Sequence, residues 1–119
     1  MAERTAFEEW VRRYVDAWES NDPEEIGSLF TDEAHYYTAP HRQPWSGREG
    51  IVEGWLDRKD EPGQWRFSWE ILGVEGDLGF VKGVTTYEDG DYSNLWVIRL
   101  EGDRASEFTE WWMEVEEEE

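Results

Sequence analysis

Residues 65–71, Trp65-Arg66-Phe67-Ser68-Trp69-Glu70-Ile71, alternate large apolar and polar side chains. An alternation of period two is typical of a β-strand that buries one of its faces. Three turn signals follow this stretch, at Gly76-Asp77, Asp89-Gly90 and Gly102-Asp103. The second half of the chain is therefore predicted to form four long strands joined by tight turns, an antiparallel meander.

The length of each turn predicts which side chains share a face of the sheet, because the side-chain period of a strand is two. Asp89-Gly90 is predicted as a two-residue loop, which places Thr85 opposite Asn94. Residues 75–77 are predicted as a three-residue loop, which places Phe67 opposite Thr85.

The turn at residues 101–103 leaves two alternatives. A three-residue loop places Asn94 opposite Glu110, whereas a two-residue loop would exchange the faces of the last strand. The longer loop is preferred because it brings Phe108 and Trp112 to the side where the other aromatic residues lie.

With these registers, one face of the sheet is predicted to be aromatic. It carries Trp65, Phe67, Trp69, Tyr87, Tyr92, Trp96, Phe108 and Trp112. One polar row, Thr85, Asn94 and Glu110, crosses this face. The opposite face mixes apolar residues such as Trp111 and Met113 with charged ones, which suits an outer or subunit-contact surface.

The first half of the chain is predicted to be mainly helical. Apolar residues recur at steps of three and four between Thr5 and Ser20, behind a predicted capping box of Thr5 and Glu8. Asp22 is a predicted N-cap with Pro23 at the first helical position. This short second helix is predicted to carry Ile26, Leu29 and Phe30.

A third helix is predicted to start at the capping box formed by residues 46–49 and to carry Ile51, Val52, Trp55 and Leu56. Residues 34–38 have the composition of a short strand, and residues 39–45 that of a loop. Helices followed by an antiparallel sheet predict an α+β fold with the helices on one face of the sheet. We expect one domain over residues 1–115 and an acidic tail over 116–119.

Composition limits the classes of partner. The 119 residues include 30 acidic and 11 basic side chains, for a net charge of −19, which disfavours nucleic acid and membrane surfaces as partners. Leu, Ile, Val and Phe together number only 23, but 9 Trp and 5 Tyr supply large apolar rings for a core. There is no cysteine, no apolar stretch of membrane-spanning length and no signal peptide, so we expect a cytoplasmic protein.

Segments from both halves of the chain resemble the SnoaL-like members of the nuclear transport factor 2-like superfamily. They are residues 14–18, residues 22–34, residues 44–51 and residues 108–112, Phe108-Thr109-Glu110-Trp111-Trp112. The resemblance implies a strongly curved, mainly antiparallel sheet wrapped round helices as a cone with an internal pocket. It also implies a homodimer, since members commonly pair through the sheet. The superfamily includes ketosteroid isomerases, polyketide cyclases, epoxide hydrolases and many binding domains.

The isomerase pattern matches this chain at one of three catalytic positions. The tyrosine that donates a hydrogen bond to the substrate oxyanion corresponds to Tyr14, whereas the general-base aspartate falls on Thr38. The second oxyanion acid falls at or next to Trp96, and no polyketide-cyclase aspartate is matched on the late strands. Glu110 is the nearest substitute.

Glu110 and Tyr14 are therefore the candidate catalytic residues, because a carboxylate among aromatic rings has a raised pKa that suits acid/base chemistry. The predicted binding residues are Trp18, Tyr36, Thr38, Trp55, Thr85, Tyr92, Asn94, Trp96, Phe108 and Trp112. The structural alternative is that Thr85 and Asn94 merely hold Glu110 in a hydrogen-bond network, or that Glu110 faces water. His41 is a second choice as an acid/base group, and neither it nor His35 has the spacing of a metal site.

The leading hypothesis is an acid/base isomerase, cyclase or hydrolase that acts on a small hydrophobic, cyclic molecule without metal or cofactor. The alternative is a non-catalytic domain that binds a small molecule or serves for dimerisation, for which the loss of a base at Thr38 is the main argument.

Overall fold

The computed structural model describes residues 4–57, 65–88 and 90–115, and within them the chain forms three helices and one six-stranded sheet. The helices are α1 (Arg4–Ser20), α2 (Pro23–Ser28) and α3 (Gly47–Asp57), and the strands are β1 (Phe30–Tyr37), β2 (Trp45–Ser46), β3 (Trp65–Glu75), β4 (Leu78–Tyr87), β5 (Gly90–Glu101) and β6 (Arg104–Glu114). The strand order is β2-β1-β6-β5-β4-β3. Only β1 and β6 pair in parallel, so the predicted α+β class with a mainly antiparallel sheet is confirmed.

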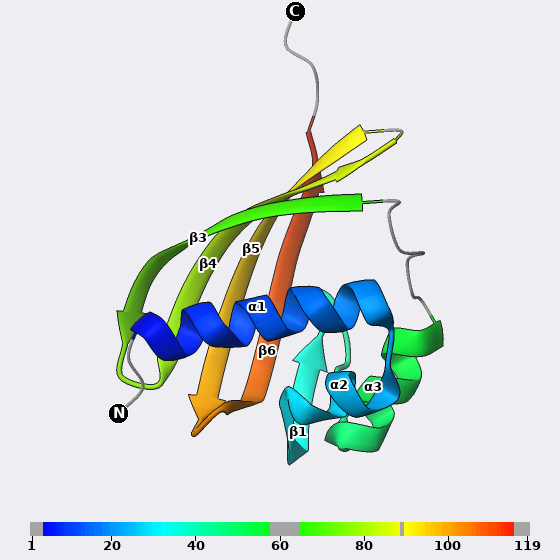
Figure 1. The fold of residues 1–119 in the computed structure, drawn as a ribbon, viewed down its shortest axis with the longest axis vertical. Coiled ribbons are helices and arrows are strands. Elements are labelled where there is room, and N and C mark those ends of the chain that lie inside the picture. Colours follow the sequence, from blue (N-terminus) through cyan, green and yellow to red (C-terminus); the bar gives the residue numbers. More distant parts are fainter. Residues whose placement is uncertain (1–3, 58–64, 89, 116–119) are drawn as a thin grey trace, which may run out of the picture.

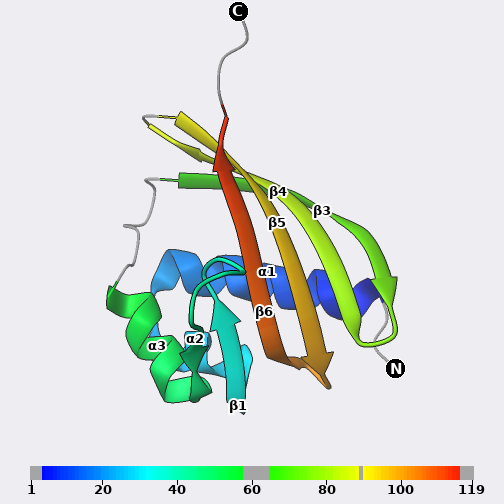
Figure 2. The same cartoon turned by 180° about the vertical axis from the view of Figure 1, so that it is seen from behind.

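The helices and the curved sheet form two layers. Helix α1 crosses the inner, concave face of the sheet, while α2 and α3 lie beside β1 (Figure 1). Seen from behind, β5 and β6 lie in front of α1 and their outer face is not covered by any helix (Figure 2). The sheet does not close on itself, which leaves a space between its concave face and the helices.

The predicted helices are confirmed with small changes at their ends. In α1 the buried residues include Phe7, Trp10 and Tyr14, as the helical spacing predicts. The predicted capping box is wrong, because α1 begins at Arg4 and Thr5 lies inside its first turn. The N-cap of α2 is confirmed, since the Asp22 side chain accepts a hydrogen bond from the backbone N–H of Glu24 at 2.9 Å.

Two residues assigned to the second helix lie elsewhere. Leu29 is the C-cap of α2, and Phe30 is the first residue of β1, so the helix is shorter and the strand longer than predicted. In addition, Trp45 and Ser46 form the short strand β2 against β1, where a loop was predicted up to Trp45.

The hairpin loops between β3 and β4 and between β5 and β6 have two residues each, which corrects the two predicted three-residue loops. Glu75 pairs with Leu78 and Glu101 pairs with Arg104, so each loop consists of one glycine and one aspartate. Gly76 has φ 59° and Gly102 has φ 69°. Positive φ at only the first of two loop positions is the requirement of a type II′ hairpin turn, which a glycine meets without strain.

The side chains still lie on the predicted faces of the sheet, because each of these two-residue loops is accompanied by a β-bulge. The extra, unpaired residue is Leu72 on β3 in the first case and Ser106 on β6, opposite Arg99 and Leu100, in the second. An extra residue in one strand reverses the side-chain alternation beyond it, which offsets the shorter loop. The pairing of Phe67 with Thr85 is therefore as predicted.

The pairings of β4 with β5 and of β5 with β6 are displaced by two residues from the prediction. Thr85 pairs with Tyr92 rather than Asn94, and Asn94 pairs with Trp112 rather than Glu110. The β4–β5 turn lies between Tyr87 and Gly90, one residue earlier than predicted, and its Asp89 lies outside the described residues. A displacement of two leaves every side chain on its predicted face.

Aromatic rings from α1 and the sheet fill the core at the closed end. The Trp10 ring is fully buried among Tyr14, Phe30 and Phe108, and its indole N–H donates to the Leu29 carbonyl at 2.9 Å. A methyl group on Gly79 of β4 would overlap the Phe7 ring, so this glycine lets α1 approach the sheet closely. In the described part of the chain, no helix is both long and apolar enough to cross a membrane. The predicted tail over 116–119 lies outside the described residues.

Candidate functional site

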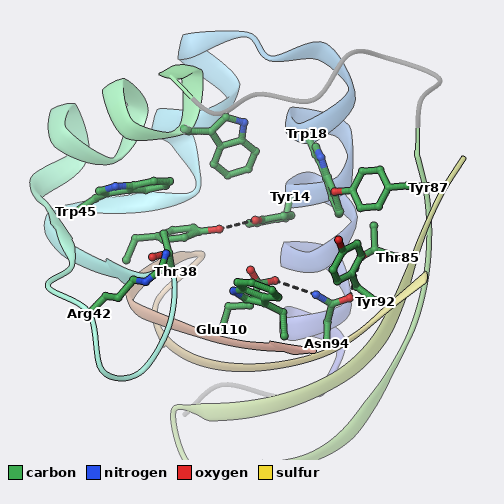
Figure 3. A pocket seen from close by; sticks show the side chains of 13 residues that line it. Tyr14, Trp18, Thr38, Arg42, Trp45, Thr85, Tyr87, Tyr92, Asn94 and Glu110 are labelled. Carbon is green, nitrogen blue, oxygen red and sulfur yellow. Dashed lines mark hydrogen bonds between the residues drawn. The ribbon is translucent and has the colours of Figure 1, made fainter. Parts of the chain in front are cut away.

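A cavity of about 490 Å³ opens between the concave face of the sheet, α1 and α3. Its wall is formed by Tyr14, Trp18, Tyr36, Thr38, Arg42, Trp45, Trp55, Thr85, Tyr87, Tyr92, Asn94, Glu110 and Trp112. Eight of these thirteen residues are aromatic, and the polar row of the sheet lies at the base (Figure 3). A cavity of this size, mainly apolar with a few convergent polar groups, is typical of small-molecule sites.

The structure brings together most of the residues that the sequence predicted for the site. Both candidate catalytic residues line the cavity, as do Trp18, Tyr36, Thr38, Trp55, Thr85, Tyr92, Asn94 and Trp112. The other two predicted binding residues, Trp96 and Phe108, are fully buried in the core next to Tyr14 and do not reach the cavity wall.

Glu110 lies at the centre of a hydrogen-bond network that spans β4, β5 and β6. Its Oε2 accepts from the indole Nε1 of Trp96 at 2.7 Å and from the amide Nδ2 of Asn94 at 3.2 Å. The Thr85 hydroxyl donates to Asn94 Oδ1 at 2.8 Å. Because Thr85 donates to the amide oxygen, the Asn94 amide nitrogen is directed at the carboxylate. The network therefore holds Glu110 in one orientation.

The surroundings of Glu110 give it a near-neutral pKa. Burial raises the pKa of this carboxyl from 4.5 to about 7, although the hydrogen bonds from Trp96 and Asn94 favour the ionised form. The Glu110 side chain keeps an intermediate solvent exposure, because it lines the open cavity. A group with a pKa near 7 is populated in both protonation states at neutral pH, so it can accept or donate a proton.

Tyr14 of α1 and Tyr36 of β1 form a second polar pair in the cavity wall. Their hydroxyl oxygens are 2.7 Å apart, so one of the two donates to the other (Figure 3). Burial, and to a smaller extent the nearby Glu110 charge, raises the pKa of both phenols, and they remain protonated at neutral pH. One hydrogen bond uses one of two hydroxyl protons, which leaves a proton that the pair can donate to a bound ligand.

The indoles of Trp55 and Trp45 are held in place by contacts with neighbouring residues of the protein. Trp55 Nε1 donates to Asn21 Oδ1 at 3.3 Å, and Asn21 adopts the left-handed conformation, with φ 53°, directly after α1. The Trp45 ring stacks on Tyr36, with centroids 4.8 Å apart, and packs against Gly54 of α3, where a methyl group would overlap it. These contacts fix the rings before any ligand enters.

Thr38 lines the cavity at the end of β1, so the position of the isomerase base is occupied by a side chain that cannot accept a proton at neutral pH. Glu110 pairs directly with Trp96 across β5 and β6, and it therefore lies beside the position of the second oxyanion acid. His35 and His41 are exposed, and neither lines the cavity. Among the described residues, no three acidic, histidine or cysteine side chains form a metal-binding cluster.

Three lining residues, Arg42, Trp45 and Tyr87, were not among the predicted site residues. Tyr87 was placed on the correct face, and its position near the open end follows from the strand register. Arg42 and Trp45 both lie in residues 39–45, the segment predicted as a loop. The one local signal for Trp45 is Gly54, since a glycine on the inner side of a helix often accommodates a ring.

Comparison with known proteins agrees with this geometry. The SnoaL-like domain matches residues 11–113, which include the helices, the sheet and the cavity. The chain belongs to the SnoaL-like family of the nuclear transport factor 2-like superfamily. No curated protein matches it in sequence.

Solved structures share the fold of this SnoaL-like protein at low sequence identity. A nuclear transport factor 2-like protein of unknown function from Burkholderia xenovorans is 14% identical, with a TM-score of 0.77 over 97% of this chain and 88% of that chain. An LEH-like epoxide hydrolase from M. tuberculosis is 13% identical, with a TM-score of 0.64 over 92% of this chain and 84% of that chain. A hypothetical protein with a ketosteroid isomerase-like fold from Catenulispora acidiphila, in complex with trimethylamine, is 20% identical, with a TM-score of 0.64 over 87% and 84%.

Proposed function

We propose that this protein binds a small hydrophobic, cyclic molecule in the aromatic cavity and that Glu110 transfers a proton to or from it. The observation that carries the proposal is the position of Glu110. It is a single carboxyl group oriented by Trp96 and Asn94 on the wall of an aromatic cavity. The reaction class is an isomerisation, cyclisation or hydrolysis that needs acid/base catalysis and no metal.

In this proposal Tyr14 and Tyr36 supply the second polar contact. The pair has one hydroxyl proton to donate, and a ligand carbonyl or hydroxyl oxygen placed near it would receive a hydrogen bond. Glu110 then stands on the sheet side of the same ligand. A carboxyl group and a hydrogen-bond donor that contact the same ligand suit acid/base catalysis, because one moves the proton while the other stabilises developing charge.

The experiment has a binding step and a turnover step. Steroid-like and polyketide-like compounds are screened by quenching of tryptophan fluorescence, and each compound that binds is tested for conversion. Glu110→Gln keeps the shape of the side chain but cannot take up a proton. We expect the variant to bind the compound and to lose turnover by at least about a hundredfold. Unchanged turnover in Glu110→Gln would remove Glu110 from the mechanism.

The second candidate is a binding domain without catalysis, and Thr38 is the observation that favours it. With threonine in place of the isomerase base, the cavity keeps its aromatic wall but loses one proton acceptor. This alternative is supported if every compound that binds is recovered unchanged, at any pH between 6 and 9.

We also propose that the protein forms a homodimer through the outer face of the sheet and acts in the cytoplasm. Trp111 and Met113, on the outer face of β6, are 41% and 66% exposed. A net charge of −19 on each subunit opposes association, so we expect the dimer to strengthen with added salt. Light scattering at low and high salt tests this, and Trp111→Lys should shift the population to monomer. A wild-type monomer at high salt would exclude the dimer.

A further inference from the structure

Glu110 lies in the cavity without a cationic partner among the described residues. The described ion pairs join surface side chains, for example Arg48 with Asp32 and Arg99 with Asp77. Arg42 is the one cationic residue among the described lining residues, but it is exposed and makes no ion pair with Glu110. A buried carboxylate is normally paired, because removing a charge from water costs free energy that a counter-charge offsets.

One oxygen of the carboxylate is free to hold a ligand. Both described hydrogen bonds end on Oε2, and none within the described residues reaches Oε1. In Figure 3 the second carboxylate oxygen is directed away from Asn94 and toward the side of the cavity where Tyr14 lies. The protein therefore orients an acceptor into the cavity, and residues 4–57, 65–88 and 90–115 supply no donor for it.

The rest of the wall has the chemistry that attracts an organic cation. The faces of Trp and Tyr rings carry negative potential and attract ammonium groups within about 6 Å of the ring centre. One continuous aromatic group in the cavity wall is formed by Tyr14 of α1, Trp55 of α3, Tyr36 of β1 and Trp45 of β2. Its ring centroids are 4.8 Å apart for Tyr36–Trp45 and for Tyr14–Trp55, and the Tyr14 and Tyr36 hydroxyls are hydrogen-bonded. The overall charge of −19 favours the approach of a cation from solution.

We propose that the cavity takes a hydrophobic amine, protonated or quaternary, whose nitrogen lies between Glu110 Oε1 and the aromatic group of Tyr14, Tyr36, Trp45 and Trp55. This inference rests on the proposed function, because it names the chemical class of the molecule that the cavity binds. The cation would supply the missing counter-charge of Glu110, and the rings would contact the apolar part of the ligand.

The experiment compares two compounds of the same shape that differ in charge. Phenyltrimethylammonium is the cation, and tert-butylbenzene is its neutral counterpart. Each is titrated into the wild-type protein at pH 8 and followed by tryptophan fluorescence. We expect the cation to bind at least about tenfold more tightly, because the ionised Glu110 carboxylate adds a counter-charge to the contacts with the rings.

Two variants locate the source of this preference. Glu110→Gln removes the charge in the cavity, and we expect it to bind the two compounds within about threefold of each other. Glu107→Gln removes one charge from the exposed, outer side of the same strand, so it is the matched control and should keep the wild-type preference. Loss of preference in both variants would mean that net charge, not Glu110, attracts the cation.

The pH dependence of the wild type gives a second measurement that needs no variant. The other titratable or charged lining groups are Tyr14 on α1, Tyr36 on β1, Arg42 after β1, Tyr87 on β4 and Tyr92 on β5. Tyrosine and arginine side chains do not change charge between pH 5.5 and 8. Protonation of Glu110 should therefore reduce the preference for the cation at pH 5.5, whether or not Glu110→Gln folds.

The outcomes separate the two proposals. Equal binding of both compounds to the wild type at pH 8, or tighter binding of tert-butylbenzene, overturns the amine proposal and leaves the hydrophobic cavity intact. Failure of both compounds to bind a folded protein counts against the proposed function as well. A preference for the cation that is the same at pH 5.5 and 8 overturns the assignment of Glu110 as its partner.

Discussion

The raised pKa of Glu110 makes a quantitative prediction about stability. Below pH 4.5 both the folded and the unfolded chain keep this carboxyl protonated, so it contributes nothing to the free energy of unfolding. Between pH 4.5 and about 7 the unfolded chain ionises first, so stability falls as pH rises, by about 1.4 kcal/mol per pH unit. Above pH 7 the carboxyl is ionised in both states, and the loss in free energy of unfolding stays constant at about 3 kcal/mol.

Glu110→Gln removes this cost, and the difference between variant and wild type should depend on pH. The expected gain in stability is about 1 kcal/mol at pH 5.5 and about 3 kcal/mol at pH 8, a change of about 2 kcal/mol. Any difference in how glutamine packs or hydrogen-bonds to Trp96 is the same at both pH values and cancels in this comparison. Measurements start at pH 5.5 because solubility is lowest near the isoelectric point of about 4.3.

The assay is urea unfolding of the wild type, Glu110→Gln and Glu107→Gln at pH 5.5, 6.5, 7.5 and 8. The other 28 acidic residues are common to all three proteins, so the difference between each variant and the wild type isolates one carboxyl. Glu107 is exposed, and its variant should show a difference that is nearly independent of pH. A pH-independent difference for Glu110→Gln would refute the reasoning, because it would mean that burial does not raise this pKa.

Three further substitutions test the packing that positions the site. Gly79→Ala should destabilise the protein by about 1–3 kcal/mol in urea unfolding, because the added methyl overlaps Phe7, whereas Gly73→Ala, with open space around it, should cost less than about 1 kcal/mol. Asp22→Ala should lower the free energy of unfolding by about 1 kcal/mol through loss of the α2 N-cap, and Asp22→Asn should restore most of it. Asn21→Ala should lower stability by about 1–2 kcal/mol more than Asn21→Gly, since only glycine adopts the left-handed backbone without strain; equal losses would assign the effect to the lost hydrogen bond instead.

The sequence predicts which side chains share a face of the sheet, because an error of two residues in the strand register leaves every side chain on the same face and only an odd error exchanges the faces. Loops of two residues were predicted as three at residues 75–77 and 101–103, yet the bulges on the neighbouring strands returned the side chains to the predicted faces. The exact partners were not predictable. A hairpin signal such as Asp89-Gly90 allows a loop one residue earlier, and side-chain packing across the sheet selects between such registers.

The residues of the candidate site were also predictable only where they lie on regular helices and strands. Residues on regular elements, such as Tyr14 on α1 and Glu110 on β6, were found because periodicity places them on the inner face. Arg42 and Trp45 were not, because the segment between β1 and α3 has no periodicity and its path depends on contacts with α3. Trp96 and Phe108 share the face of Glu110, but the Tyr14 ring of α1 packs against both of them and they are fully buried. Alternation along a strand does not show which residues of a face a helix covers.

The polar row of Thr85, Asn94 and Glu110 indicates that the aromatic face of the sheet binds a ligand and does not only form the hydrophobic core. An apolar side chain at position 110 would pack against Trp96 and Tyr14 without the cost of burying a carboxyl, and a cavity lined by rings alone would be more stable. The chain instead directs a tryptophan N–H and an asparagine amide at one oxygen of Glu110 and leaves the other without a partner among the described residues. Hydrogen bonds that orient a buried carboxyl without neutralising its charge are typical of functional sites, where a protein loses some folding stability and gains a contact for a ligand. If the loss of stability that Glu110 causes at high pH disappears when phenyltrimethylammonium is bound, the ligand supplies the counter-charge that the fold omits. The same carboxyl then lowers the stability of the free protein and binds the ligand.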